Sequence, residues 1–308
     1  MDTTSRRRPA MSDAETFVAH RDLMFSMAYR MLGTVADAED VVQDAWLRWS
    51  AAPRDEVSQP RAYLARTVTN LALNRLRSAQ ARREAYVGPW LPELLLTRTH
   101  PDIAERAELT ESVSVAMLVV LESLSPEERA VFVLREVFDF AHAEIAVAMG
   151  RSEASVRQIA HRAREHVHAR RPRFEVDPGR QRVVIERFLS AAVGGDINGL
   201  LAVLAPDVTL TTDGGGVTQA ALRPIRGADK VARVLAAYAG RPYQGFTPEQ
   251  KSIELAEING EPGVLLLGDG QVIAAGTLTV AGGRVVAIQI VTNPEKLDAI
   301  SARRTLEL

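Results

Sequence analysis

The sequence contains no cysteine, and this one absence excludes several kinds of chemistry. Without thiols the chain has no disulfide framework, no thiolate nucleophile and no cysteine-bound zinc site. Apolar runs are also short, because LAVLAP and VLLLG fall far below the roughly 18 residues that a membrane-spanning helix requires. The arginines at positions 6–8 are not followed by the apolar region of a secretory signal, so we expect a cytoplasmic protein with no membrane partner.

The net charge is close to balanced, at −2, but the charges are unevenly distributed along the chain. Six acids lie in Asp37–Glu56, whereas Arg61–Arg83 contains six arginines and no acid. A second basic block covers Arg151–Arg173. Separate acidic and basic blocks are typical of a chain that binds one protein partner and one polyanion, although charged helix faces are also common as solvated surface. The charge pattern alone leaves both interpretations open.

The first part of the chain has the apolar spacing of helices. It predicts one helix from Ala14 to the break at Gly33-Thr34, a second over Asp37–Trp49 and a third over Ala62–Ser78. The following segment, Tyr86–Pro101, has three prolines around WLPELLL and predicts a non-helical linker with an apolar anchor.

Helices are expected to resume at about Asp102. The motif LSPEER then gives a start signal, with Ser125 as the N-cap, Pro126 at the first helical position and Glu128 completing a capping box. We therefore expect a second all-helical domain.

The segment EIAVAMGRSEASVRQIAHRARE, residues 144–165, is the most specific local pattern. It predicts a short helix that ends at Gly150 and a longer helix capped by Ser152, which together form a helix-turn-helix. The inner face of the longer helix would carry Val156, Ile159, Ala160, Ala163 and Val167. Its outer face would carry Ser155, Arg157, Gln158, His161 and Arg162. Such side chains contact base edges and phosphates, so DNA binding is favoured over a purely structural helical pair.

The last third of the chain changes character. One amphipathic helix is predicted over Gln181–Val193, and short alternating strands follow at residues 207–212, 264–268, 271–280 and 284–291. The pair Gly282-Gly283 predicts a hairpin turn between the last two strands. A helix followed by a curved antiparallel sheet indicates an α+β cone-shaped half-barrel.

Residues 14–170 resemble the bacterial sigma factors of the extracytoplasmic-function group, with a region 2 domain and a region 4 helix-turn-helix. DAEDVVQDAWLRW (Asp37–Trp49) is similar to the segment that grips the clamp helices of the polymerase β′ subunit, and PRAYLARTVTNLALNRLR (Pro60–Arg77) to the segment that melts and reads the −10 element. The resemblance implies a core-binding set of Asp37, Asp40, Val41, Gln43, Asp44 and Trp46. It implies a −10 set of Arg66, Asn70, Asn74, Arg75 and Arg77, and it assigns the outer helix-turn-helix face to the −35 element.

The remainder resembles the SnoaL-like fold, and one sigma subgroup carries this domain fused at its C-terminus with WLPEP, DGGG and NPDKL motifs. Here these motifs stand as WLPEL (90–94), DGGG (213–216) and NPEKL (293–297). Leu94 replaces a linker proline, which is expected to loosen the linker, and Glu295 keeps the charge of the aspartate it replaces. The implied interdomain regulatory residues are Trp90, Leu91, Pro92, Glu93, Asp213, Gly214, Gly215, Gly216, Asn293, Pro294 and Lys296.

The DGGG segment has several interpretations. A phosphate cradle would need its glycines to lead into a helix, and the strand-like and small polar flanks argue against that. A catalytic Asp213 and an ordinary turn both stay open, although no histidine follows Val176 to act as a partner base. The resemblance favours docking, in which Asp213 accepts hydrogen bonds from linker amides and Lys296 pairs with Glu93.

We therefore expect a promoter-specificity subunit of RNA polymerase whose own C-terminal domain modulates its activity. Its partners would be the polymerase core, through the β′ clamp helices and the β subunit, and promoter DNA; a small ligand in the C-terminal domain is left open. No catalytic residue, cofactor or metal is expected, since His161, His166 and His168 have no carboxylate or thiolate placed to complete a site. The alternatives are a SnoaL-like isomerase or hydrolase with an attached DNA-binding module, and a two-domain repressor.

The expected domain organisation has four segments. Residues 14–85 would form region 2, 86–110 the linker, 111–172 the region 4 helix-turn-helix, and 178–308 the SnoaL-like regulatory domain.

Overall fold

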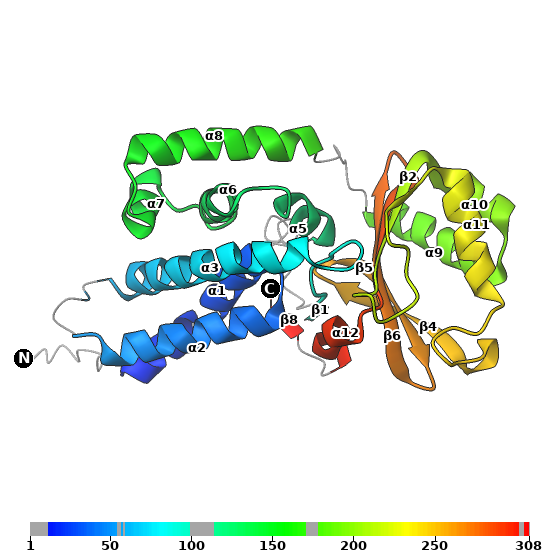
Figure 1. Ribbon diagram of the computed structural model, residues 1–308, viewed down its shortest axis with the longest axis horizontal. Helices are drawn as coiled ribbons and strands as arrows, with labels where there is room; N and C mark the ends of the chain where they lie inside the picture. Colours follow the sequence, from blue (N-terminus) through cyan, green and yellow to red (C-terminus); the bar gives the residue numbers. More distant parts are fainter. Residues whose placement is uncertain are drawn as a thin grey trace, which may run out of the picture.

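The computed structural model describes residues 12–53, 57, 59–98, 114–170, 178–301 and 305–307. Two helical modules lie side by side at one end of the molecule, and an α+β domain lies at the other (Figure 1). The helix expected to resume at Asp102 and the second half of the expected linker lie outside the described residues.

The first helical module contains α1 (Asp13–Leu32), α2 (Val35–Ala51) and α3 (Pro60–Glu84). A capping box between Ser12 and Glu15 starts α1, and Gly33, with φ at +74°, ends it. The three expected helices are present. The third runs past Ser78 to Glu84, because SAQARRE contains no helix-breaking residue.

The second helical module contains α5 (Val115–Leu121), α6 (Pro126–Phe132), a π-helical turn (Val133–Val137), α7 (His142–Met149) and α8 (Glu153–Arg170). The capping box of α6 forms as expected, with the Glu128 amide donating to Ser125 Oγ at 3.3 Å. Gly150 takes the left-handed conformation at the end of α7, and Ser152 Oγ accepts from the Ser155 amide at 3.2 Å. The expected helix-turn-helix is therefore present, and the five residues of its inner face are buried.

The C-terminal domain is built on a sheet in the order β3-β2-β7-β6-β5-β4-β1-β8. Its strands are β2 (Leu204–Asp213), β3 (Ile225–Arg226), β4 (Lys251–Ile258), β5 (Glu261–Gly268), β6 (Gln271–Ala281), β7 (Arg284–Val291) and β8 (Thr305–Glu307), and the linker adds β1 (Leu96–Arg98). Its helices are α9 (Pro178–Gly194), α10 (Ile197–Val203), α11 (Ala228–Ala239), a 3-10 turn (Pro248–Gln250) and α12 (Pro294–Ser301). The hairpin at Gly282-Gly283 forms as expected, with both glycines at positive φ.

The two faces of this sheet have different neighbours. Helices α9, α10 and α11 lie on the side away from the helical modules, whereas α12 lies on the side that faces them, near the end of the sheet formed by β1 and β8 (Figure 1). On the inner side, Leu91 and Leu94 of the linker pack in one buried cluster with Val115 of α5, Ile258 of β4 and Leu297 of α12. The linker is therefore part of the core of the C-terminal domain.

The two helical modules share one apolar core. Helix α3 packs against both α6 and α7, and a single buried cluster runs from α1 through α8. The structure is therefore a closed arrangement, in which the second module covers part of α3. Among the described residues, no helix is long and apolar enough to cross a membrane.

Candidate interdomain junction and nucleic-acid interface

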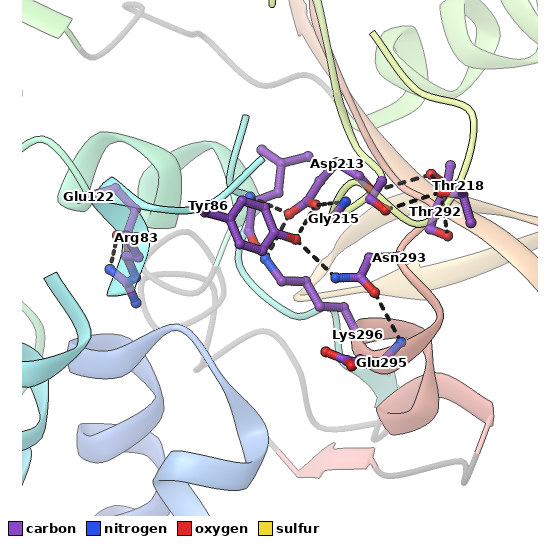
Figure 2. Close-up of polar contacts among 12 residues, drawn as sticks. Arg83, Tyr86, Glu122, Asp213, Gly215, Thr218, Thr292, Asn293, Glu295 and Lys296 are labelled. Atoms are coloured by element: carbon purple, nitrogen blue, oxygen red, sulfur yellow. Dashed lines mark hydrogen bonds and ion pairs between the residues drawn. The ribbon is translucent and has the colours of Figure 1, made fainter. Parts of the chain in front are cut away.

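Asp213 ends β2 and is fully buried against the linker. Its carboxylate accepts hydrogen bonds from the Tyr86 hydroxyl at 2.6 Å and the Leu91 amide at 2.7 Å, and it pairs with Lys296 Nζ at 2.7 Å (Figure 2). The Gly215 amide donates to the same carboxylate at 3.2 Å. With four donors around it and no solvent contact, this carboxylate holds the linker and has no free position for a substrate.

Lys296 lies in a cage of aromatic rings. Its Nζ is 4.1 Å from the centre of the Trp90 ring and 4.9 Å from that of Tyr86, and it donates to the Leu91 carbonyl at 2.6 Å. Burial lowers the pKa of Lys296, and the Asp213 carboxylate offsets part of that shift. Lys296 is thus held charged by a carboxylate, a carbonyl and two π faces.

Lys296 forms its ion pair with Asp213, and the charge of Glu93 also raises the pKa of Lys296. The Glu93 carboxylate accepts a hydrogen bond from the Val35 amide at 2.7 Å, at the first residue of α2. A carboxylate is stabilised there by the free amides and the dipole of the helix N-terminus. Glu93 therefore ties the linker to the first helical module, while Lys296 ties it to the C-terminal domain.

The glycines of DGGG allow close approach of the linker. Gly215 and Gly216 both have positive φ, and a Cβ at Gly216 would lie 3.0 Å from Val87 of the linker. Gly214 is equally crowded, since a Cβ there would lie 2.7 Å from the Ala220 side chain. These positions require glycine because other chain segments lie against them.

The NPEKL segment completes this surface. Asn293 Nδ2 donates to the Tyr86 hydroxyl at 2.9 Å, while Asn293 Oδ1 accepts from the Glu295 amide at 3.1 Å (Figure 2). Pro294 is the first residue of α12, a position where proline is favoured. The geometry thus joins the linker, DGGG and NPEKL segments at one place.

The apolar residues of the linker are its anchors. Leu91, Pro92 and Leu94 are all buried. Leu94, expected to loosen the linker, is 1% exposed and packs with Leu91 on the sheet. Here a larger apolar side chain adds buried area and so strengthens docking.

A second cluster of charges, which the sequence did not reveal, joins the linker to both helical modules. The Arg83 guanidinium at the end of α3 lies 3.8 Å from the centre of the Trp90 ring, and it donates to the Leu32 carbonyl at 2.5 Å. Glu122, just after α5, forms ion pairs with Arg83 and Arg129. Burial lowers the pKa of Arg83, and Glu122 offsets part of that shift.

The arginines of this cluster are unusually deep. Arg30 is 2% exposed and Arg129 is 1% exposed, and burial lowers the pKa of Arg30 to about 10. Arg129 Nε donates to the Arg30 carbonyl at 3.1 Å, whereas Arg30 Nε and Arg129 Nη2 have no hydrogen-bond partner among the described residues. Glu122 is therefore the carboxylate that pairs with two buried or nearly buried guanidinium groups, those of Arg83 and Arg129.

The residues expected to bind the polymerase core lie on α2 with different exposures. Asp40 and Gln43 are exposed, and Asp37, Asp44 and Trp46 are partly exposed. Val41 is the exception, because it is fully buried in the core shared with α1 and α3. Val41 therefore packs the module and is not part of its surface.

Arg75, expected at the −10 element, points to this acidic face instead. Its guanidinium pairs with Asp37 at 3.3 Å, Asp40 at 2.9 Å and Asp44 at 3.4 Å. Burial alone would lower the pKa of Arg75, but its bonds to Asp40 and the other two acids raise it. In this closed arrangement Arg75 therefore pairs with the acidic face of α2, and its role at the −10 element stays a prediction.

The remaining −10 residues lie along α3. Arg66, Asn74 and Arg77 are exposed, and Asn70 is partly exposed and donates to the Arg66 carbonyl at 3.1 Å. A cavity of about 290 Å³ adjoins Arg66 and is also lined by Tyr63 and, from the second module, by Phe140 and Ile145. In this closed arrangement α7 therefore faces the surface expected to take the −10 element.

The −35 residues lie on the outer face of α8. Arg157, Gln158, His161 and Arg162 are exposed, and Ser155 is partly exposed. Arg157 pairs with Glu153 on its own helix, and Arg162 lies 3.6 Å from Glu128. The expected face is thus solvent-accessible and its arginines have local acidic partners.

Two helical modules, the second ending in a helix-turn-helix, define the region 2 and region 4 pair of a sigma-70-type transcription initiation factor. The Sigma-70 region 2 family model matches residues 16–82, and the Sigma-70, region 4 model matches residues 114–167. Relatives matched along most of its length show that the chain belongs to the extracytoplasmic-function (ECF) RNA polymerase sigma factors.

Its relatives support this assignment along most of the chain. It is 40% identical to the ECF RNA polymerase sigma factor SigJ of Mycobacterium tuberculosis, over 92% of this chain and 93% of that protein. It is 31% identical to the probable ECF RNA polymerase sigma factor SigI of the same species, over 92% of this chain and 94% of that protein. The crystal structure of SigJ superposes with a TM-score of 0.74 at 36% identity and covers 93% of this chain and 98% of that one.

The expected class of fold and function is confirmed. Two all-helical sigma domains precede a SnoaL-like α+β domain, and the protein is an RNA polymerase sigma factor that binds the polymerase core and promoter DNA. The family assignment favours this function over a SnoaL-like enzyme with an attached DNA-binding module. The exact domain boundaries and the roles of individual residues stay predictions.

Proposed function

We propose that the C-terminal domain controls transcription from the promoter by binding the linker that joins the two sigma modules. The observation that carries this proposal is the buried Asp213–Lys296 pair, which holds both the amide and the carbonyl of Leu91. Linker position sets the separation of the modules, and that separation determines whether −10 and −35 elements can be engaged together. No covalent reaction is part of this function.

In the same proposal, α2 binds the β′ clamp helices of the core, and α3 and α8 read the two promoter elements. The acidic face of α2 supports the first role, because Asp37, Asp40 and Asp44 outnumber the one arginine between them. Excess negative charge on an exposed helix favours a basic partner. The exposed amide and guanidinium groups of α3 and α8 support the DNA roles.

Charge reversal on α2 tests the core contact. Asp40→Lys together with Asp44→Lys is expected to weaken binding to purified core polymerase at least tenfold, because it replaces attraction to basic helices by repulsion. Pull-down and fluorescence titration would measure this effect, and circular dichroism would check the fold. Asp229→Lys, a charge reversal at an exposed site on α11, is the control and should bind as the parent does. Unchanged binding of the double variant would contradict the assignment of α2.

Alanine substitutions on α8 test the −35 contact. Arg157→Ala and His161→Ala are each expected to weaken binding of the holoenzyme to the cognate −35 element, by about 1–3 kcal/mol where the parent side chain forms a bidentate hydrogen bond to a base. Arg182→Ala on the exposed face of α9 is the control. Anisotropy titrations with cognate and scrambled −35 elements separate the roles, since an equal decrease in affinity for both sequences would identify phosphate contacts instead.

A further inference from the structure

Glu127 joins the two sigma modules through two arginines that belong to different modules. Its Oε1 lies 3.3 Å from Nη2 of Arg77 on α3 and 2.5 Å from Nη2 of Arg151 in the helix-turn-helix turn. One carboxylate oxygen of Glu127 thus binds an arginine from each of the two modules. The arrangement exists because α6 lies between α3 and α8 (Figure 1).

Glu127 is not a member of the capping box that starts its own helix. The capping box of α6 uses Ser125 and Glu128, whose carboxylate accepts from the Ser125 amide at 3.1 Å. The Glu127 side chain is 30% exposed, and those of Arg77 and Arg151 are 55% and 46% exposed. Exposed pairs of this kind contribute little to folding stability, so the bridge is readily exchanged for another anion.

Both arginines belong to segments that we expect to contact the DNA backbone. Arg77 is in the α3 segment that resembles the −10 reader. Arg151 is in the turn that leads into α8, and residues at the start of a recognition helix lie close to the DNA backbone. Sequence reasoning did not select Arg151, because it precedes the outer face of the helix and carries no periodic signal.

We propose that Glu127 holds Arg77 and Arg151 in the closed protein as a substitute for phosphate, and that both arginines bind DNA once the modules separate. Arg151 is then an additional DNA contact, and Glu127 is a residue that lowers the DNA affinity of the free factor. This inference rests on the proposed DNA roles of α3 and α8. It adds to them a mechanism by which the free factor avoids DNA until core polymerase separates its modules.

The test compares Glu127→Gln with the parent on duplex DNA of unrelated sequence, by anisotropy over a range of salt concentrations. We expect the full-length variant, free of polymerase, to bind about three- to tenfold more tightly at low salt. Its salt dependence should steepen by up to about 2 in log–log slope, because each newly bound phosphate contributes about 0.9. In an Arg77→Ala, Arg151→Ala background the same substitution should change nothing.

The control is Asp139→Asn, which removes one negative charge from the same module where the carboxylate pairs with Arg135. An equal gain from Asp139→Asn and Glu127→Gln would overturn the inference, because the effect would then be general charge. In the holoenzyme, Arg151→Ala should weaken promoter binding two- to tenfold, and Glu127→Gln should leave it unchanged. Parental promoter binding by the Arg151→Ala holoenzyme would overturn the role of Arg151, whereas failure of the parent holoenzyme to bind would instead overturn the proposed function.

Discussion

Asp213→Ala is expected to release the linker from the C-terminal domain and to change promoter output while core binding persists. The substitution leaves Lys296 buried without its carboxylate, and it removes the acceptor of the Tyr86 hydroxyl and the Leu91 amide. Removing one partner of a buried ion pair costs about 3–5 kcal/mol. Because α2 lies outside this contact, its binding to the core should stay within about twofold of the parent, a difference of roughly 0.4 kcal/mol.

Multi-round transcription measured beside core-binding titration distinguishes these effects. Trp90→Ala and a chain ending at residue 173 should shift transcription in the same direction as Asp213→Ala, since each removes part or all of the contact between the linker and the C-terminal domain. Asp229→Ala, which removes an exposed carboxylate paired with Arg233, should behave as the parent. If all three disruptive variants transcribe as the parent does, the C-terminal domain has a role other than intramolecular control.

A paired substitution distinguishes two causes of altered transcription, which are release of the linker and a decrease in folding stability. Asp213→Leu combined with Lys296→Met removes both charges and should recover the part of the thermal stability that Asp213→Ala loses through the unpaired Lys296 charge. It should not recover parental transcription, because the Leu91 amide and carbonyl still lack their partners. Recovery of both properties would show that stability alone governs output.

Glu122→Ala is expected to open the contact between the two sigma modules. Arg83 and Arg129 would lose their shared carboxylate, and Arg129 already has one guanidinium nitrogen without a partner among the described residues. An uncompensated buried charge costs about 3–5 kcal/mol, which separation of the modules relieves by returning the arginines to water. The closed arrangement should therefore lose population even where each module stays folded.

Distance measurements test this second result directly. Because the chain has no cysteine, Arg48→Cys on α2 and Ala154→Cys on α8 provide unique sites for a pair of fluorescent dyes. Energy transfer between them should fall in the Glu122→Ala protein, and urea unfolding should begin at lower concentration. Glu186→Ala, on the exposed face of α9, is the matched control. Unchanged energy transfer together with unchanged unfolding would mean that Glu122 does not hold the modules together.

Features encoded by neighbouring residues could be predicted from the sequence. The capping box at Ser125, the left-handed Gly150 and the inner face of α8 each follow from a local pattern, whose successive residues lie at most four positions apart. The glycine hairpin at residues 282–283 is of the same kind. Such signals are local, and the tertiary packing of the protein is consistent with each of them.

Contacts between distant segments could not be derived in the same way. The expected docking of linker amides on Asp213 came from family motifs, whereas the partners of Glu93 and Lys296 depend on how three modules meet. The acidic partners of Arg75 could not be derived for the same reason, because position along α3 does not reveal which helix it faces. Strand β4 was missed because its sequence, KSIELAEI, is mostly exposed and lacks a clear apolar alternation.

The pairing of β1 with β8 has a consequence for biosynthesis. These strands lie side by side in parallel register from Leu96 with Thr305 to Arg98 with Glu307. About two hundred residues separate them, which at a ribosomal rate of ~5–20 residues per second is roughly 10–40 s of synthesis. In the later part of that interval, once Arg170 at the end of α8 has been made, the nascent chain has both sigma modules but an incomplete sheet around its linker. Under the proposed control through the linker, a newly made factor therefore has a period in which polymerase can bind it before that control is assembled.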